Sequence, residues 1–528
     1  MLLDGRALES PAIEADLCIV GTGAAGITIA REFANTSVSV VLLESGAFEA
    51  DADTMQLNQG GITGLPYFPL EACRLRFFGG TTNHWGGWCM PPQAHDMEQR
   101  SWIPDTGWPF SLEHLAPFYA RAHKLCELSE YNYSCQFWSS SETPVLPLDP
   151  DGLVSVTTQF SPPTRFGLKY RDDVVRPENI KVVLHANAHT IETRDAQVTR
   201  ISCATLSGKR FVVSAKYFVL AMGGIENPRL LLLSRSQNEQ GLGNANDLVG
   251  RYFADSFVSD GGEIIFSDTN QNVDFYQRHI SRGQPVKGYL QPSKRAQEEL
   301  GMTTVTYAIE PVFDPYYERA SRSDGVASFN HLQGSLKNGT VPDNLGFHLG
   351  RIIGDIDDVG ATAYRKLVHG DMPISHYRFS IGQDCAPNRD SRVRLGDEVD
   401  ALGQRKAVLD WKIQDIDRHT FRTAQRFLAQ EVGRQGLGRV RVASYGENDW
   451  PQLDSGAMRA GWHHLGTTRM HADSRLGVVD PDCRLHEAGN LFVAGSSVFP
   501  SFEGQPTLTI VALSLRLSDH LKKLLRNT

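Results

Sequence analysis

The sequence predicts an α/β protein in which an antiparallel region is inserted into a fold built on a parallel sheet. The chain has 528 residues, which exceeds the size at which one hydrophobic core stops growing, so two domains are expected. Near the N-terminus an apolar strand leads straight into a glycine-rich turn and a helix. Residues 255–445 instead alternate polar and apolar side chains, as antiparallel strands with one solvated face do.

The composition is that of an ordinary globular protein, with 41% hydrophobic and 21% charged residues. A formal net charge of −9 argues against nucleic acid as a partner, because phosphate binding relies on clustered Lys and Arg. We expect no membrane span, since no apolar run reaches about 18 residues. Residues Met1–Ala15 lack a signal pattern, which favours the cytoplasm and leaves export with a partner subunit open. Eight cysteines without a CxxC pair predict free thiols and no metal site.

The N-terminal motif follows the order of a dinucleotide-binding unit. A strand is expected at Asp16–Val20, a turn at Gly21–Gly26, a helix at Ile27–Phe33, and a second strand at Val38–Leu43 that ends at Glu44. A glycine-rich turn alone is weak evidence, but the flanking strands, helix and acidic residue supply the full context. The segment therefore predicts binding of a dinucleotide, without distinguishing NAD from FAD.

Each residue type in this motif has a physical role. Gly21 permits the tight turn, Gly23 allows the backbone to approach a pyrophosphate, and Gly26 allows the helix to pack closely on the strand. The helix N-terminus presents amide groups to the phosphates, and Glu44 would accept hydrogen bonds from ribose hydroxyls. The motif thus proposes as cofactor-binding residues Gly21, Gly23, Ala24, Ala25, Gly26, Glu44 and Ser45.

Three later segments favour FAD over NAD. Tyr217–Gly224 and Asn490–Ser497 each resemble a buried strand ending in a glycine turn, and an apolar helix is expected from Thr507 to about Leu525. A nicotinamide dehydrogenase usually completes its cofactor site within one contiguous half of the chain, whereas here the first and last segments both resemble cofactor walls. Read separately, either strand segment is also consistent with a plain core strand. These segments add to the site Ala221, Gly223, Gly495 and Ser496.

Five motifs together resemble the glucose–methanol–choline (GMC) oxidoreductase family, most of all its bacterial branch related to pyranose oxidases and sugar dehydrogenases. They are Gly21–Gly26, Phe78–Trp85, Ala386–Arg392, His463–Met470 and Asn490–Pro500. The resemblance extends over almost the whole chain and is loosest in the middle. It implies an FAD enzyme that oxidises an alcohol carbon to a carbonyl.

With this resemblance, the predicted fold is an FAD-binding Rossmann-like domain with an inserted α+β substrate domain built on an antiparallel sheet. The FAD-binding domain is expected to be discontinuous, comprising residues 1–254 and 446–528, and the substrate domain comprises residues 255–445. Within the insertion, strands are expected at Gly262–Phe266 and His376–Ile381.

Four further segments of the insertion carry a specific expectation. A hairpin joins Ser391–Leu395 to Ala407–Trp411, and a helix capped by Asp417 runs to about Val432. Phe313–Arg319 is interpreted as a surface loop in preference to a sugar-stacking platform, and Gln333–Asn344 as a loop that covers the site.

Two adjacent histidines, His463 and His464, stand beside the glycine turn at Gly466. Oxidation of an alcohol needs a base for the hydroxyl proton, and the pKa of histidine suits that role. Without further information such a pair is more often a surface or core feature. The resemblance assigns the base to His463, three residues before Gly466, and leaves His464 as its neighbour.

The turn before the last helix carries Gln505, where the family usually has His or Asn. Its amide would donate a hydrogen bond to a substrate oxygen; the alternative is that Gln505 only shapes the turn. Pro506 suits the first turn of a helix, and a helix beginning near Thr507 would point its positive end at the flavin and stabilise the reduced state. Gln505, Pro506 and Thr507 are therefore also cofactor candidates.

A glycine-rich stretch around His84 would let the backbone approach the flavin ring. His84 matches the position at which pyranose oxidases attach FAD covalently through histidine, and close contact without a bond is the equal alternative. The remaining cofactor candidates are Gly79, Gly80, Thr81, Asn83, His84, Trp85, Gly86, Gly87 and Ala188.

The leading functional hypothesis is FAD-dependent oxidation of an alcohol, with sugars or glycosides as the favoured substrates on the strength of the resemblance alone. The electron acceptor is oxygen, a quinone or a redox protein, and the chain can act as an oligomer. Alternatives are a non-sugar alcohol such as a sterol or aliphatic hydroxyl, a lyase in which FAD is structural and His463 acts as acid and base, and a nonenzymatic binding protein.

Overall fold

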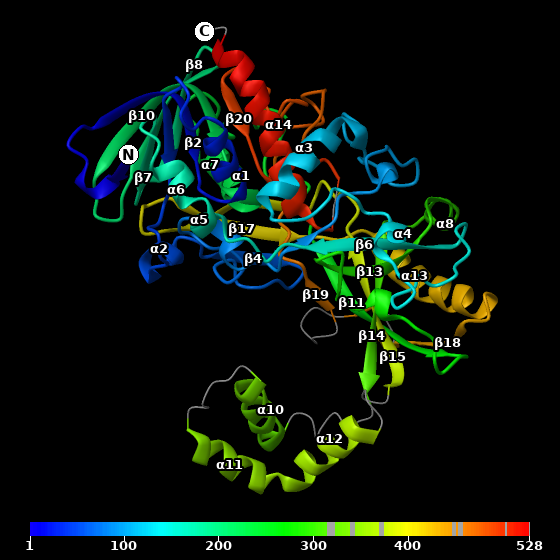
Figure 1. Cartoon of the computed structure of the whole chain (residues 1–528). Helices are drawn as coiled ribbons and strands as arrows, with labels where there is room; N and C mark the ends of the chain where they lie inside the picture. Colours follow the sequence, from blue (N-terminus) through cyan, green and yellow to red (C-terminus); the bar gives the residue numbers. More distant parts are fainter. Residues whose placement is uncertain are drawn as a thin grey trace.

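The computed structural model describes residues 1–313, 323–337, 344–368, 374–445, 450–451, 458–501 and 504–526. It forms an elongated body with a helical arm that stands away from it (Figure 1). Residues 314–319 of the predicted aromatic loop lie outside the described residues. All eight cysteines are buried and none forms a disulfide. No helix among the described residues is long and apolar enough to cross a membrane.

The N-terminal sheet carries the dinucleotide motif. Its parallel core is formed where β2 pairs with β3 on one side and β10 on the other, and β10 also pairs with β20 from near the C-terminus. The strand order is β1 (Leu2–Asp4), β7 (Ile180–Leu184), β3 (Val40–Leu43), β2 (Ala12–Val20), β10 (Arg210–Leu220), β9 (Gln197–Ala204) and β8 (Asn187–Arg194), with β20 (Leu491–Val493) beside β10. The chain ends thus meet in one sheet, as the sequence predicts.

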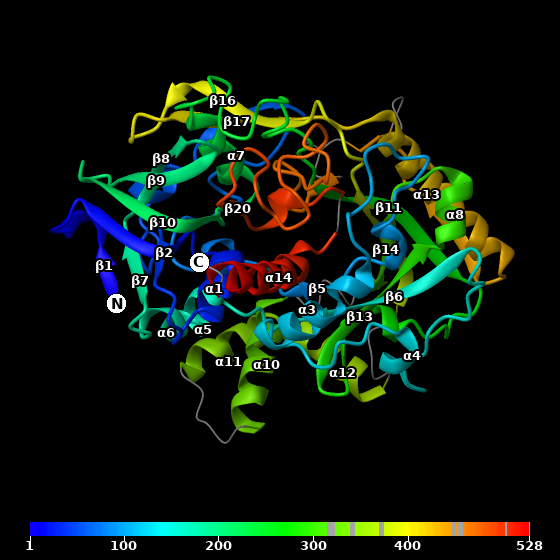
Figure 2. The same ribbon diagram turned by 90° about the horizontal axis from the view of Figure 1, so that it is seen from above.

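Helices cover both faces of this sheet. Figure 2 shows α7 (Gly223–Leu233) on one side and α1 (Ala24–Glu32) with α14 (Pro506–Arg526) on the other. α14 packs on α1 and on α3 (Leu112–Leu125). Strand β2 is fully buried from Leu17 to Val20 because it lies between these layers. The smaller helices on this side of the molecule are α2 (Ala52–Gln56), α5 (Phe166–Lys169) and α6 (Arg171–Val175).

A large antiparallel sheet forms the second half of the body. Its order is β18 (Gly438–Val442), β11 (Ser256–Phe266), β15 (Ile374–Asp384), β14 (Val305–Phe313), β13 (Gln284–Pro292), β6 (Leu153–Phe160) and β5 (Trp88–Cys89), with β12 (His279–Ser281) beside β13 and β19 (Met458–Ala460) beside β11. The predicted strands at 262–266 and 376–381 are parts of β11 and β15, which pair directly. The short helices α4 (Cys135–Trp138) and α8 (Lys294–Leu300) flank this sheet.

The long helix α13 (Asp415–Arg434) packs its apolar side on the large sheet, where Tyr307 of β14 donates to the carbonyl of Ala424. The helix was predicted to begin with Asp417 as its cap, and this detail is wrong. Gln414 is the capping residue, and Asp417 completes a capping box by accepting the N–H of Gln414. A Gln is a less common cap than Asp, so the propensity pointed to the wrong residue.

The predicted hairpin forms as β16 (Arg392–Val399) and β17 (Arg405–Trp411). It does not join the large sheet, because β17 pairs in parallel with β4 (Gly60–Gly64) and β16 packs on α7. Conversely, β5 and β6 precede residue 254 but belong to the large sheet. The sheets therefore depart from the predicted division at residues 254 and 445, and the domain boundaries themselves stay a prediction.

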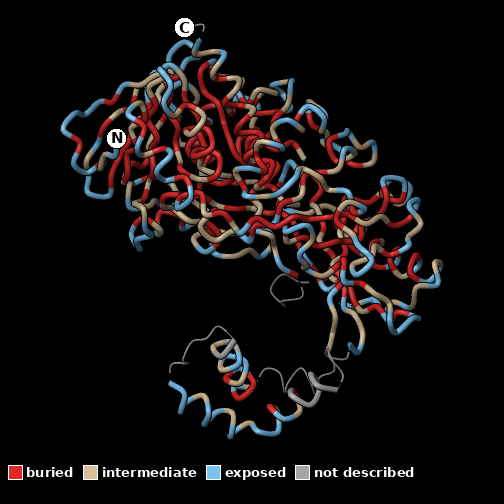
Figure 3. Tube along the Cα trace, viewed as in Figure 1, coloured by how far each residue is buried: buried red, intermediate tan, exposed pale blue. Residues whose placement is uncertain are grey.

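A helical arm is inserted between β14 and β15. It consists of α10 (Asp324–Lys337), α11 (Leu345–Gly354) and α12 (Ile356–Val368), which pack on one another. Figures 1 and 3 show the arm projecting from the end of β14 and β15 with much of its surface exposed. The predicted covering loop at 333–344 is wrong for residues 333–337, which are helical in α10, and its residues 338–343 lie outside the described residues.

Candidate active site

One cavity of about 560 Å³ joins segments from both ends of the chain. It is lined by the first glycine turn, by residues of the 80–88 and 221–224 segments, and by the tail segments 461–464, 495–496 and 505–507. Between them lies the parallel core of the N-terminal sheet, where β20 brings residues near 495 beside the end of β10. The topology of that sheet is what brings the ends of the chain to one pocket.

The first glycine turn has the geometry that its sequence predicts. Gly21 has a φ of 102°, and a Cβ there would lie 2.6 Å from the carbonyl oxygen of Ala221. A Cβ on Gly26 would lie 1.9 Å from the carbonyl oxygen of Gly21, so α1 can approach the turn only with glycine at that position. At Gly23, by contrast, no atom of the described residues lies within 4 Å of the point that a Cβ would occupy. The turn is tight on its inner side and open toward the cavity.

Glu44 lies at the end of β3 and lines the cavity. Its carboxylate accepts hydrogen bonds from the N–H groups of Thr22 (3.2 Å) and Gly46 (2.9 Å) and from the hydroxyl of Thr22. Glu44 therefore ties the end of β3 to the glycine turn. A carboxylate has about four acceptor sites, so these bonds are compatible with a further bond to a ribose hydroxyl.

Most of the predicted cofactor residues line this cavity. They are Gly21, Gly23, Ala24, Ala25, Glu44, Ser45, Gly80, Thr81, His84, Trp85, Gly86, Ala188, Ala221, Gly223, Gly495, Ser496, Gln505, Pro506 and Thr507. The structure does not place Gly26, Gly79, Asn83 or Gly87 on the cavity wall. Gly26 makes the close helix contact, and Asn83 donates to the carbonyl of Phe78 to hold the turn. Gly79 and Gly87 adopt left-handed backbone conformations packed against residues 161–167.

His84 places a polar side chain on the cavity wall. Its Nε2 atom is buried and has no hydrogen-bond partner in the part of the chain that the structure describes. The ring lies 5.4 Å from that of Trp462, and burial together with the nearby Arg165 lowers the pKa of His84. A buried polar atom without a partner is costly, so this nitrogen at the cavity wall is suited to contact a ligand.

His463 lines the cavity from the opposite end of the chain. Its Nδ1 atom is 3.1 Å from the hydroxyl of Ser256, and its backbone N–H donates to the carboxylate of Asp255 at 2.9 Å. Burial lowers the pKa of His463 to about 4. The imidazole is therefore neutral at physiological pH, which is the form that accepts a proton.

His464 also lines the cavity, and its ring is packed in the cavity wall. Its Nε2 lies 3.6 Å from the Sγ of Cys73, and its ring packs near those of Tyr67 and Phe253. Burial, and to a smaller extent the charge of Arg74, lowers the pKa of His464 to about 3. The two adjacent histidines thus have different surroundings, and that of His464 is the more enclosed.

The last helix begins at the cavity. Gln505 and the first residues of α14, Pro506, Thr507 and Ile510, all line it. The exposed amides and the positive end of the helix dipole are therefore directed at whatever the cavity holds.

A charged cluster on the wall was not predicted from the sequence. Glu226 of α7 pairs with Arg74 (2.7 Å), Arg76 (3.0 Å) and Arg229 (3.1 Å), and Arg229 pairs also with Asp400 (2.6 Å). All five line the cavity. Three guanidinium groups against two carboxylates give a net charge of +1, and the arginines hold the pKa of Glu226 far below its usual range against the effect of burial. The two closely spaced arginines before the Gly79–Gly80 turn were the available signal.

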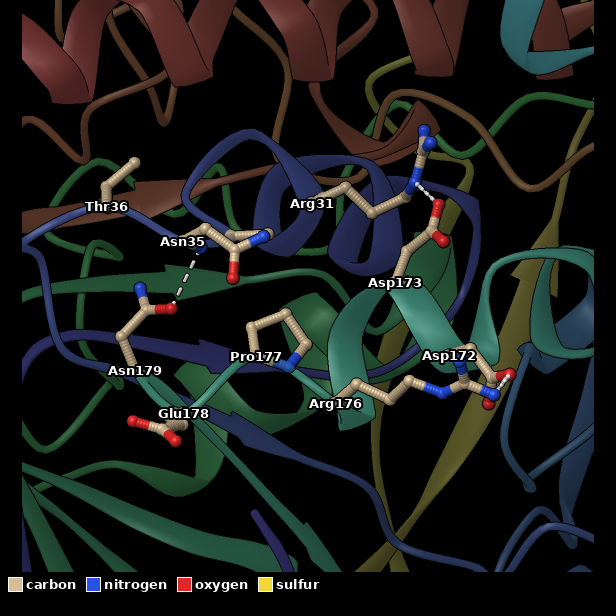
Figure 4. Close-up of a pocket in the computed structure, with 10 residues that line it drawn as sticks. Arg31, Asn35, Thr36, Asp172, Asp173, Arg176, Pro177, Glu178 and Asn179 are labelled. Atoms are coloured by element: carbon tan, nitrogen blue, oxygen red, sulfur yellow. Dashed lines mark hydrogen bonds and ion pairs between the residues drawn. The ribbon is translucent and has the colours of Figure 1, made fainter.

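A second hollow lies on the surface of the N-terminal half, with a volume of about 880 Å³ (Figure 4). Four of its charged side chains form ion pairs, Arg31 with Asp173 and Arg176 with Asp172, and Asn179 accepts the N–H of Asn35. It contains none of the predicted site residues. This surface hollow is therefore not the candidate active site.

Comparison with known proteins agrees with this geometry. Residues 16–237 match the model of the FAD dependent oxidoreductase family, and the chain is an FAD-dependent oxidoreductase. Residues 387–514 match the model of the GMC oxidoreductase family. The C-terminal part of the chain is thus a GMC oxidoreductase domain, and the two matches together confirm the expected FAD cofactor and oxidoreductase class.

Relatives with named activities are distant. A 2-methyl-1,2-propanediol dehydrogenase of Mycolicibacterium austroafricanum is 20% identical, over 98% of this chain and 96% of its own length. A 6'''-hydroxyparomomycin C oxidase of Streptomyces lividus is 24% identical, over 95% and 90%. The fructose dehydrogenase large subunit of Gluconobacter japonicus is 25% identical, over 64% of this chain and 53% of its own length.

Solved structures share the fold. A formate oxidase is 16% identical, with a TM-score of 0.54 over 98% of this chain and 100% of its own. A pyridoxine 4-oxidase from Mesorbium loti is 15% identical, with a TM-score of 0.55 over 96% and 99%. At these identities the likeness confirms the fold class, and the substrates of those proteins do not carry over.

The cavity fits FAD by its own chemistry. The open space at Gly23 allows a pyrophosphate to approach the backbone. The Nε2 atom of His84, which has no partner among the described residues, can contact the cofactor. At the other end of the cavity, the N-terminus of α14 supplies backbone amides. The chain thus has residues for both halves of the cofactor.

Proposed function

We propose that this protein oxidises a CH–OH group of a sugar or glycoside to a carbonyl, with His463 as the base. The observation that carries the proposal is that His463, from near the C-terminus, lines the same cavity as the glycine turn that begins at Gly21. FAD, when bound, supplies the acceptor for a hydride at its N5 atom. The substrate hydroxyl gives its proton to the imidazole while its carbon gives up the hydride, which leaves a C=O bond.

The neighbours of His463 suit this role. If the Nδ1 proton is donated to the hydroxyl of Ser256, Nε2 holds the lone pair that accepts the substrate proton. The lowered pKa of His463 keeps the ring neutral before the reaction. Gln505, on the same cavity wall, has an amide that can donate to the substrate oxygen and hold it in place.

Sugars are favoured over smaller alcohols by the aromatic side chains of the cavity. Trp88 and Trp462 line it and are each 38% exposed, as large apolar surfaces. The planar face of an indole matches the apolar C–H face of a sugar ring. Relatives named as fructose dehydrogenase, C-glycoside 3-oxidase and paromamine 6'-oxidase point to the same class of substrate.

A non-sugar alcohol is the second candidate, because the relative matched over 98% of this chain is named for a small branched diol. An anaerobic panel separates the two candidates. The FAD-loaded protein is mixed with aldoses, ketoses, C-glycosides, aminoglycosides and aliphatic diols, and loss of flavin absorbance is followed. Bleaching by a sugar or glycoside is expected; bleaching by diols alone would replace the sugar assignment, and no bleaching by any alcohol would contradict the oxidation itself.

We further propose that His84 would hold FAD covalently through Nε2, since that atom is buried and has no partner among the described residues. Forming this N–C bond would break a C–H bond of the flavin; the electron pair would reduce the flavin itself until the enzyme's electron acceptor removes it, and the proton would go to solvent. Flavin colour that stays with acid-precipitated protein, and is lost in His84→Ala, is the expected result. Release of all flavin by acid would leave His84 as a contact only.

A further inference from the structure

Asp255 is a buried carboxylate to which the proposed chemistry assigns no role. It immediately precedes β11, with 0% of its surface exposed. One oxygen accepts the backbone N–H of His463 (2.9 Å) and of Ser256 (2.7 Å), and the other accepts the phenol of Tyr67. Burial raises the pKa of Asp255 to about 7, against the effect of these hydrogen bonds. A buried carboxylate that accepts three hydrogen bonds is built to hold its donors in place.

Trp462, the residue before His463, has a strained backbone. Trp462 has a φ of 62°, in the left-handed region, which a bulky side chain adopts only when its surroundings enforce it. On one side, the N–H of Gly461 donates to the carbonyl of Ser256 at 2.9 Å. On the other, the N–H of His463 donates to Asp255. Gly461 and His463, the residues on either side of Trp462, thus donate their N–H groups to Ser256 and Asp255, which are consecutive in the chain.

Asp255 and Ser256 also position the imidazole of His463. Ser256 presents its hydroxyl 3.1 Å from Nδ1 of His463, while its own N–H is held by Asp255. Tyr67 closes the arrangement from the other side, packed edge-on against Trp411. If the backbone at Trp462 relaxed to a negative φ, the direction of the next side chain, His463, would change.

We propose that Asp255, supported by Tyr67, is a positioning residue that holds the 461–463 turn in its strained conformation and so directs the imidazole of His463 into the cavity. This inference rests on the proposed role of His463 as the base. Asp255 acts through the turn and touches neither substrate nor cofactor.

The test compares Asp255→Ala and Asp255→Asn in FAD-loaded protein. We expect the limiting rate of flavin reduction to fall at least about tenfold in Asp255→Ala, with a change below about threefold in KM and in FAD content, because a misdirected base slows the chemical step more than binding. Asp255→Asn retains an oxygen that accepts an N–H and an amide that can bond to Tyr67, so it is expected to lie between wild type and Asp255→Ala.

A second substitution tests the route through the strained turn. Glycine adopts positive φ without cost, so Trp462→Gly removes the need for the clamp. Trp462→Gly alone is expected to slow the reaction, because it deletes an aromatic wall of the cavity. In that background, however, Asp255→Ala should cost at most about a third of the factor that it costs in wild type. An equal loss in both backgrounds would overturn the proposal.

Hydrogen exchange separates this inference from the function on which it rests. Asp255→Ala is expected to speed exchange at the amide of His463 at least about tenfold, because its acceptor is lost. Unchanged exchange would overturn the clamp whatever the kinetics. Faster exchange with an unchanged rate of flavin reduction would support the clamp on the turn and contradict His463 as the base. If only Asp255→Asn folds, that variant is measured instead. Because it keeps an uncharged and weaker acceptor, exchange at the His463 amide is expected to speed up by less than about tenfold, and a slowed flavin reduction with unchanged exchange would overturn the clamp.

Discussion

At the scale of single residues, the proposed oxidation depends on the protonation state of His463. Burial lowers its pKa from 6.5 to about 4, so the neutral base is present at neutral pH and is lost as the pH falls through the lowered value. Activity is therefore lost in acid, not in base, because the proton-accepting form is the neutral one.

We therefore expect the rate of flavin reduction in wild type to fall on the acid side with a midpoint below 6.5. His463→Ala should be slower by about 10²–10⁴-fold and should lack that acid limb. Stopped-flow measurement of flavin absorbance between pH 4 and pH 8 tests both points. A midpoint at or above 6.5 would contradict the assignment of the burial effect to this residue.

His464→Gln is the matched control, since it changes the neighbouring ring while leaving His463 in place. Its side chain contacts Cys73 and Tyr67 in the wall, so a loss below about tenfold in the same assay is expected. A larger loss in His464→Gln than in His463→Ala would shift the catalytic assignment by one residue.

The site residues that could be predicted from the sequence are those whose roles follow from local spacing. The glycines at 21, 23 and 26 sit within one turn, and their roles in tight packing and open approach can be derived from short-range sterics. Asp255 could not be found in this way, because it lies 208 residues before His463 and meets it only through the pairing of β19 with β11. A lone Asp before an apolar strand carries no signal of such a contact.

At the scale of elements, α1 depends on one missing side chain. A Cβ at Gly26 would lie 1.9 Å from the carbonyl oxygen of Gly21, and backbone on both sides leaves no flexible neighbour to move. We expect Gly26→Ala to lose FAD and to lower the unfolding midpoint by several degrees; flavin content and thermal unfolding check this.

Gly433→Ala is the control for glycine replacement in a helix. Gly433 lies in α13, and no atom of the described residues is within 4 Å of its would-be Cβ. Alanine there should be neutral or stabilising by about 0.5–1 kcal/mol. If both variants behave alike, the close packing at Gly26 is not what the helix requires.

The N-terminus of α14 provides a test of electrostatics. Thr507 is in its first turn and lines the cavity. A negative charge there opposes the charge that reduced flavin carries, so Thr507→Asp should lower the flavin reduction potential, on the order of 30 mV for a two-electron couple destabilised by about 1.4 kcal/mol.

Thr507→Asn, which has nearly the same shape and no charge, should leave the potential within about 10 mV of wild type, a fraction of the shift that a 1.4 kcal/mol effect represents. Redox titration against dyes measures both. Equal shifts in the two variants would indicate a packing effect in place of the electrostatic one.

Elements were predicted where a pattern persists over a whole strand or helix, as in β2, β10, β11 and α14. Which sheet a strand joins was harder to predict. β6 and the β16–β17 hairpin each have an ordinary strand pattern, and partners far away in sequence decide their placement. Alternation in a strand indicates a buried face but not what buries it.

At the scale of the whole molecule, buried carboxyls and buried imidazoles have opposite effects on how stability changes with pH. Burial raises the pKa of Asp417 from 3.8 to about 7 and does the same for Asp255. Between these values the folded state keeps a proton that the unfolded state has released, so stability falls as pH rises from about 4 to about 7. His463 and His464 have pKa values lowered to about 4 and about 3. The unfolded state alone binds their protons below pH 6.5, so they make stability rise with pH over nearly the same range.

The contributions of the two carboxyls and of the two imidazoles to the pH dependence of stability have opposite signs and should largely cancel. Replacing one of these groups should therefore reveal the contribution of the opposite kind. Asp417→Asn deletes a falling contribution of up to about 1.4 kcal/mol per pH unit, so its stability relative to wild type should increase as pH rises from 4.5 to 6.5. His464→Gln deletes a rising contribution and should show the reverse trend. The backbone N–H groups of Ala386 and Gln414 both donate to the carboxylate of Asp417, and Asp417→Asn removes the acceptor for one of them. This loss lowers stability at every pH, so the quantity to compare is the slope of unfolding free energy against pH. Urea unfolding of the FAD-loaded variants at pH 4.5, 5.5 and 6.5 measures it; curves parallel to wild type in both variants would show that burial does not shift these groups as the structure indicates.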